Sequence, residues 1–239
     1  MRCNSAENFV KISLCILVWN EREGCEIDVP NLPVERFHEV YAVDGGSTDG
    51  TVEYLQSRGI SVHRQPVKSL NAAYHHAVSL STGDAVVVFF PKATISPDCV
   101  LDIAKSLEKH YELVIASRNI RGGVNEEDGA FLKPRKWGVR LLALAITALW
   151  CREGFWMHDV LHGVKGFSIA AFQRMKIAET GITIDLEMVV RAYRLRLKRM
   201  ELPVQETPRI AGETHFKIWP TARKLGQFLI DEIRRPIPL

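Results

Sequence analysis

Short runs of apolar and β-branched residues recur along the chain. The run at 85–90 (Ala-Val-Val-Val-Phe-Phe) is apolar at every position, which is typical of a strand buried on both faces of a sheet. Similar runs predict further strands at 11–18, 37–44, 60–64, 113–117, 163–169 and 199–204. Amphipathic segments predict helices at 51–58, 70–80, 97–109, 170–176 and 185–197. Because strands and helices alternate at this spacing, the sequence predicts an α/β fold with a mostly parallel sheet flanked by helices.

Two later segments have a different pattern. Residues 136–151 predict a strongly apolar helix, and 141–149 is apolar almost all round. This pattern favours a core helix, and the alternative is that one of its faces rests on a bilayer. Residues 220–235 predict an amphipathic helix. We therefore expect a main domain at 1–217, with a C-terminal amphipathic helix at 218–239 packed on it.

Composition narrows the function classes only slightly. The net charge of +3 is mild and argues against a dedicated nucleic-acid or other polyanion binder. No signal peptide is expected, and no run of ~18 apolar residues predicts a membrane-spanning helix. The five cysteines are scattered and never spaced C-x-x-C, which favours reduced thiols in a cytoplasmic protein over disulfides or a zinc site.

The stretch at 43–51 (Val-Asp-Gly-Gly-Ser-Thr-Asp-Gly-Thr) joins a predicted strand to a predicted helix. A carboxylate at the end of a strand, followed by glycines and a helix, is where open α/β sheets place ligands. An ordinary strand–turn–helix connection, with Asp49 as the helix N-cap, explains the same residues equally well. From these residues alone, the two interpretations stay open.

Several motifs in order along the chain resemble family 2 glycosyltransferases. They are 16–21 (Ile-Leu-Val-Trp-Asn-Glu), the 43–51 stretch and 81–84 (Ser-Thr-Gly-Asp). In the second half, 116–118 (Ala-Ser-Arg), Asp159 and 185–187 (Asp-Leu-Glu) resemble the polyprenyl-phosphate, dolichyl-phosphate mannose synthase-like branch. The resemblance covers residues 11 to 230 and rests on the order and spacing of the motifs. It implies the GT-A fold and inverting transfer from a nucleotide sugar.

The resemblance also implies which residues bind the donor. Trp19, Asn20, Glu21 and Asp44 match the motifs that hold the nucleoside, and carboxylates can accept hydrogen bonds from base N–H groups and ribose hydroxyls. Arg209, with His215 and Lys217 nearby, falls in the late loop that closes over the diphosphate in the family.

One motif departs from the family. The usual Asp-x-Asp, which holds a divalent cation on the donor diphosphate, is replaced by Pro91, Lys92 and Ala93. Hard cations such as magnesium or manganese require oxygen ligands, so the usual metal site is predicted to be lost and no cofactor is predicted. Lys92 could neutralise the diphosphate instead, or the protein could bind without turning over. Recruitment of Asp84 or Asp98 to a metal is a third, less favoured explanation.

The resemblance further implies an acceptor site. A lipid phosphate, with a second pKa of ~6, needs cations to position it more than it needs a general base. Arg118, Arg121 and Arg135, with the neighbouring Lys136, suit that role. Arg118 and Asp159 are the predicted catalytic residues, although a surface arginine and a turn aspartate are the ordinary alternatives.

The predicted function is transfer of a hexose from a GDP- or UDP-linked sugar to a polyprenyl phosphate or related acceptor. The resemblance places this reaction at the cytoplasmic face of a membrane, with peripheral membrane contact. The alternatives are a catalytically silent nucleotide-sugar-binding or regulatory protein and a transferase with a soluble acceptor.

Overall fold

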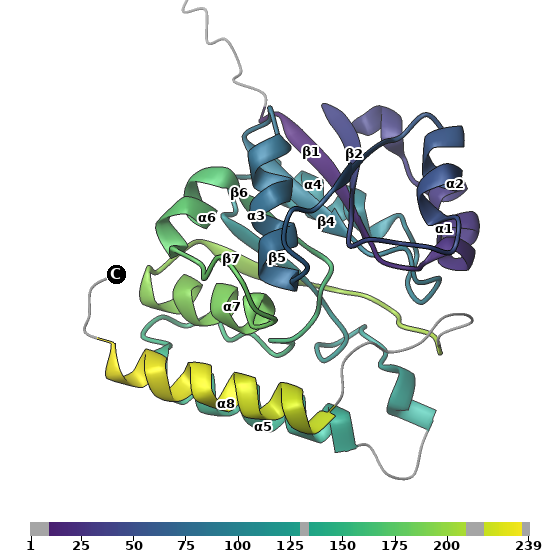
Figure 1. Cartoon of the computed structure of the whole chain (residues 1–239). Helices are drawn as coiled ribbons and strands as arrows, with labels where there is room; N and C mark the ends of the chain where they lie inside the picture. Colours follow the sequence, from purple (N-terminus) through teal and green to yellow (C-terminus); the bar gives the residue numbers. More distant parts are fainter. Residues whose placement is uncertain (1–9, 130–133, 209–217, 236–239) are drawn as a thin grey trace, which may run out of the picture.

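A seven-stranded sheet forms the centre of the computed structural model, which describes residues 10–129, 134–208 and 218–235 (Figure 1). The strand order is β3-β2-β1-β4-β6-β5-β7. The strands are β1 (Ile12–Val18), β2 (Glu39–Asp44), β3 (Ser61–Arg64), β4 (Ala85–Phe89), β5 (Leu113–Ser117), β6 (Lys165–Ser168) and β7 (Arg199–Pro203). All strand pairs are parallel except those of β6, which runs antiparallel to β4 and β5. The predicted mostly parallel sheet is confirmed.

The helices after β2 fall within a few residues of their predicted positions, whereas the sequence pattern leaves residues 24–36 open between a short helix and a loop. They are α1 (Arg22–Asp28), α2 (Thr51–Ser57), α3 (Leu70–Leu80), α4 (Cys99–Glu108), α5 (Pro134–Trp150), α6 (Ile169–Met175), α7 (Ile184–Arg194) and α8 (Ile218–Arg234). Among the described residues, three 3₁₀ turns are also present, η1 (Val29–Asn31), η2 (Val34–Arg36) and η3 (Glu126–Gly129).

Alternate residues of the central strands enter two different cores. In β1, Cys15 and Leu17 pack on the side of α3, α5, α6 and α7, whereas Leu14 and Ile16 pack on the side of α1, α2 and α4. Strands β1, β4 and β5 are buried along their whole length. The sheet is therefore sandwiched between two helical layers, which explains why these strands are apolar at nearly every position.

Helix α5 corrects the expectation of a core helix at 141–149. Its Ala143 and Ile146 are buried, but Leu141 is 65% exposed and Leu144 is 58% exposed on its other side. Because apolar side chains lie on both faces of α5, the sequence pattern does not distinguish its buried face from its exposed face. Among the described residues, no helix combines the length and apolarity that crossing a membrane requires.

Helix α8 joins the same core through Leu225, and Figure 1 shows it along the edge of the molecule with α5. Its Glu232 is almost fully buried and pairs with two arginines of α7, at 3.2 Å from Arg191 Nε and 2.7 Å from Arg194 Nη1. Charged hydrogen bonds between well-buried partners fix the position of a helix more firmly than exposed ones do. The proposed domain division at residue 217 stays a prediction.

Candidate functional site

The loop after β1 and the turn after β2 are tied together at the carboxyl edge of the sheet. Asn20 has a left-handed backbone (φ 52°), and its Oδ1 accepts the Thr48 N–H at 2.8 Å. The Asn20 N–H in turn donates to Ser47 Oγ at 2.8 Å. One step on, the Glu21 N–H donates to Thr51 Oγ1. These bonds bring the two predicted nucleoside motifs into one unit.

Asp44 shapes the turn that it begins. Its carboxylate is almost fully buried and accepts the backbone N–H groups of Gly46 at 2.9 Å and Ser47 at 3.0 Å. Gly46 has φ 93°, a conformation that glycine adopts without strain. At the start of α2, Asp49 Oδ1 accepts the Thr51 N–H, although the N-cap position itself is Gly50. Both aspartates thus organise the connection, and the nucleoside contact of Asp44 stays a prediction.

Beside this unit lies a pocket of about 510 Å³. Three of the predicted donor-site residues, Trp19, Glu21 and Lys92, line it. The lining also includes Lys68 and Lys224, which sequence reasoning did not identify. The Lys68 ammonium lies 3.7 Å from the centroid of the Trp19 ring, a cation–π contact. No motif singles out either lysine, because Lys68 is in an irregular loop and Lys224 comes from α8, far along the chain.

The segment that replaces Asp-x-Asp is held in place by residues of α1. The Ala93 N–H donates to Asp28 Oδ2 at 2.8 Å, and Ala93 has φ 52°. Burial raises the pKa of the Asp28 carboxyl to about 6. Gly24 packs so closely that a Cβ on it would lie 2.0 Å from the Pro91 carbonyl oxygen. These contacts therefore fix the conformation of the segment from which Lys92 lines the pocket.

The described residues around this segment do not fit a hard divalent cation. In the described part of the chain, no three His, Cys, Asp or Glu side chains gather as ligands would. Asp84 precedes β4 and accepts the Lys11 N–H at 2.9 Å, so it lies at the opposite end of that strand, roughly 15 Å away. Asp98 is exposed and interacts locally with Ser96. The recruitment of Asp84 is therefore excluded by its position.

Arg118 and Asp159, the predicted catalytic pair, are bonded to each other. Arg118 Nε and Nη2 donate to the two oxygens of Asp159 at 2.8 and 3.0 Å, and Arg118 Nη1 donates to Glu206 Oε2 at 3.1 Å. Burial would raise the pKa of Asp159, but the guanidinium outweighs it and holds that pKa below its usual value. The Arg118 side chain is only 16% exposed, so an ordinary surface arginine is the wrong description.

A second buried charge pair joins the neighbouring strand β6 to α7. Lys165 of β6 is fully buried, and its Nζ lies 2.5 Å from Asp185 Oδ1, in the motif at 185–187. His162 is also buried, and burial together with the nearby Arg118 lowers its pKa to about 3, so its ring is neutral. Sequence reasoning missed Lys165, because a lysine in a short strand gives no sign of an internal partner.

The remaining predicted acceptor residues are less well placed by the structure. Arg121 is exposed in the loop after β5. Arg135 belongs to α5, but its side chain lies outside the described residues, as do Arg209, His215 and Lys217. The neighbouring Lys136 Nζ pairs with Asp128.

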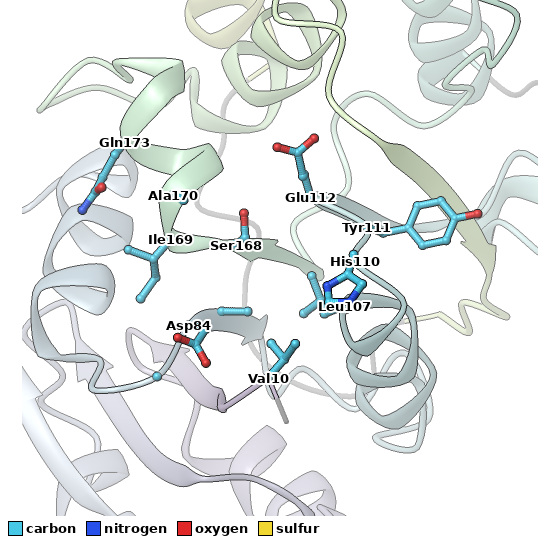
Figure 2. A pocket seen from close by; sticks show the side chains of 12 residues that line it. Val10, Asp84, Leu107, His110, Tyr111, Glu112, Ser168, Ile169, Ala170 and Gln173 are labelled. Carbon is cyan, nitrogen blue, oxygen red and sulfur yellow. The ribbon is translucent and has the colours of Figure 1, made fainter. Parts of the chain in front are cut away.

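Another pocket, of about 480 Å³, lies at the other end of β4 (Figure 2). Asp84, His110 and Glu112 line it. Glu112 is already paired with Arg174 at 2.8 Å, and Asp84 is occupied by the Lys11 backbone. Since ligands of open α/β sheets bind at the carboxyl ends of the parallel strands, the first pocket is the candidate site.

Comparisons with known proteins bear on the family and the fold of the chain. A family model described as Glycosyl transferase family 2 matches residues 35–175. The curated protein glycosyltransferase AglJ of Haloferax volcanii is 26% identical over 203 residues, which are 84% of this chain and 65% of AglJ. The chain thus spans less than two-thirds of the length of that relative.

The fold is also similar to solved structures. Glucosyl-3-phosphoglycerate synthase from Mycobacterium tuberculosis, in complex with Mn²⁺, UDP-glucose and glycerol 3-phosphate, superposes with a TM-score of 0.73 at 17% identity. The match covers 95% of this chain and 81% of the synthase. The complex of the same enzyme with Mn²⁺ and UDP-glucose gives a TM-score of 0.71. At this identity the likeness concerns the fold, and it confirms the predicted GT-A architecture.

Proposed function

The chain belongs to glycosyltransferase family 2, and we propose that it transfers a hexose from a UDP- or GDP-linked sugar to a polyprenyl-phosphate-type acceptor. The observation that carries the donor half is the pocket at the carboxyl edge, which combines the Trp19 ring with lysine side chains. A flat aromatic ring suits a nucleobase, and ammonium groups suit a diphosphate. The complexes of the similar synthase with UDP-glucose support a nucleotide-sugar donor.

The chemistry proposed needs no proton transfer at its centre. An oxygen of the dianionic acceptor phosphate attacks the anomeric carbon, the bond from that carbon to the donor diphosphate breaks, and the nucleoside diphosphate leaves with the electron pair. Charge is conserved, because the diphosphate goes from about −2 to −3 while the acceptor phosphate goes from −2 to −1. Attack from the face opposite the leaving group inverts the anomeric centre.

Arg118 and Asp159 have different roles in this proposal. Arg118 touches the acceptor phosphate, assisted by Arg121 and Arg135. Asp159 acts through Arg118 as a positioning residue, because both of its oxygens accept guanidinium N–H groups. Lys92 takes the place of the family's metal at the donor diphosphate, so turnover would not require a divalent cation, and Arg209 stays a predicted second contact to that diphosphate.

A lipid acceptor is supported by the surface of α5 and α8. In the described part of the chain, eight of the twelve large apolar side chains that are exposed belong to α5, the loop after it and α8. We call them the α5/α8 apolar surface: Trp137, Leu141, Leu144, Leu149, Phe155, Trp156, Ile230 and Ile233. Exposed arginines at 140, 152, 234 and 235 accompany them. Aromatic rings and arginines beside apolar side chains suit the interface of an anionic bilayer, at the cytoplasmic face of the membrane.

A soluble phosphate-bearing acceptor is the second candidate, because the similar synthase was crystallised with phosphoglyceric acid. Transfer assays with a short-chain polyprenyl phosphate and with 3-phosphoglycerate, each with UDP- and GDP-sugars, separate the two. Product on the polyprenyl phosphate alone supports the proposal. Product on 3-phosphoglycerate alone overturns the lipid acceptor, and donor binding without product on either indicates a catalytically silent protein.

A further inference from the structure

Three lysine side chains from distant parts of the chain line the candidate donor pocket. Lys68 comes from the loop before α3, Lys92 from the segment after β4, and Lys224 from α8. Glu21 is the carboxylate that the described lining contributes. Three ammonium groups and one carboxylate leave this described lining with a net charge of about +2, the same charge as a divalent ion.

Two of these lysines have no acidic partner among the described residues. Lys68 Nζ contacts the face of Trp19, and no ion pair is formed by Lys68 or Lys224 within that part of the chain. The buried Lys165, by contrast, is held by Asp185, and Lys136 is held by Asp128. Ammonium groups that line a pocket and form no ion pair within the described part of the chain are available to an anionic ligand.

We propose that Lys68, Lys92 and Lys224 together form the diphosphate-binding site of this protein. This inference rests on the proposed function and extends it to two residues that no motif identifies. The ligand class is the diphosphate of a nucleotide sugar. Because that group gains a negative charge as the sugar leaves, fixed cations stabilise the departing nucleoside diphosphate more than the intact donor.

Helix α8 becomes part of the donor site in this arrangement. Pro220 and Thr221, in its first turn, line the same pocket as Lys224. The helix is fixed at its other end by Glu232, which is bonded to Arg191 and Arg194. The same helix also contributes Ile230 and Ile233 to the α5/α8 apolar surface. Lys224 is therefore positioned by the packing of α8 on α7.

The test compares ligands that differ only in their phosphates. Calorimetric titrations of the full chain in EDTA use UDP and GDP, the corresponding nucleosides and inorganic pyrophosphate. We expect Lys68→Ala and Lys224→Ala each to weaken nucleoside-diphosphate and pyrophosphate binding about five- to tenfold, in the range of a charged hydrogen bond at a solvated site. Nucleoside binding should be unchanged, and the Lys→Arg variants should recover most of the loss. Lys105→Ala, on the exposed face of α4, is the matched control and should bind like the wild type.

The outcomes separate this inference from the function on which it rests. If the wild type binds UDP or GDP and neither alanine variant weakens it, the lysine site is wrong and the proposed donor class survives. If pyrophosphate binds in a lysine-dependent way but no nucleotide binds, the site stands and the nucleotide-sugar donor fails. Equal losses for the nucleoside and the diphosphate would indicate a disturbed fold and overturn the assignment, as would a wild type that binds none of these ligands.

Discussion

Asp28 gives a pH signature that can be calculated from its surroundings. Its carboxylate packs against the segment that carries Lys92 and accepts the backbone N–H groups of Ala93 and Lys92. Burial raises its pKa to about 6, from ~3.9 for an ordinary aspartate, so the folded state favours the neutral form by about 3 kcal/mol. Because the folded protein holds this proton up to a higher pH, Asp28 should lower the free energy of unfolding as pH rises from 4 to 7.

The substitution Asp28→Asn removes that ionisation. At pH 7.5 the variant should be more stable than the wild type by about 2 kcal/mol, because relief of the buried charge exceeds the loss of one backbone acceptor, which costs about 1 kcal/mol. At pH 4 the sign should reverse, and the variant should be about 1 kcal/mol less stable. Urea unfolding followed by tryptophan fluorescence at both pH values measures the difference.

The difference between variant and wild type is the diagnostic quantity, since other titrating groups cancel from it. The control is Asp102→Asn on the exposed face of α4, where the difference should stay within about 0.5 kcal/mol at both pH values. If wild type and Asp28→Asn show parallel pH dependence, then Asp28 is not a buried carboxyl with a raised pKa. Asp28 would then not be the buried group that fixes the segment carrying Lys92.

Three further predictions follow from the packing. Asp159→Asn should cost 3–5 kcal/mol in urea unfolding, because it leaves a largely buried guanidinium with one acidic partner, and a loss under 1 kcal/mol would contradict the pairing. Gly24→Ala should destabilise by about 1–3 kcal/mol through its clash with the backbone after β4, whereas Gly226→Ala, which has open space on α8, should be neutral or stabilising. Leu144→Glu should weaken sedimentation with anionic vesicles at least tenfold, and Val34→Glu, at an exposed apolar side chain on η2, should not; equal effects would contradict the membrane role of α5.

The strands could be predicted because their chemistry is local. The run at β4 is apolar throughout since both faces of that strand are covered, and that signal needs no knowledge of the neighbours. Strand direction is not encoded in this way, so the antiparallel β6 could not be told from its parallel neighbours. Helix α5 was misjudged because an apolar side chain looks the same in sequence whether it faces the core, as Ile146 does, or outward, as Leu141 does.

The lining of the candidate pocket was predictable where motifs mark the ends of strands, as at Trp19 and Glu21. It was not predictable where the partner comes from elsewhere in the chain. Lys224 reaches the pocket from α8, and Asp28 supports Ala93 across 65 positions. The replacement at Lys92 was visible in the sequence, but the loop that presents it depends on contacts between distant segments.

Hexose transfer in the presence of EDTA tests the central claim most directly. The measurement follows a labelled hexose from UDP- and GDP-sugars to a short-chain polyprenyl phosphate, with wild type and Lys92→Ala in parallel. The account predicts lipid-linked product with the wild type in EDTA, no large gain on adding Mn²⁺, and a loss of at least tenfold in Lys92→Ala. Turnover that depends on Mn²⁺, or that is equal in the two proteins in EDTA, would contradict it.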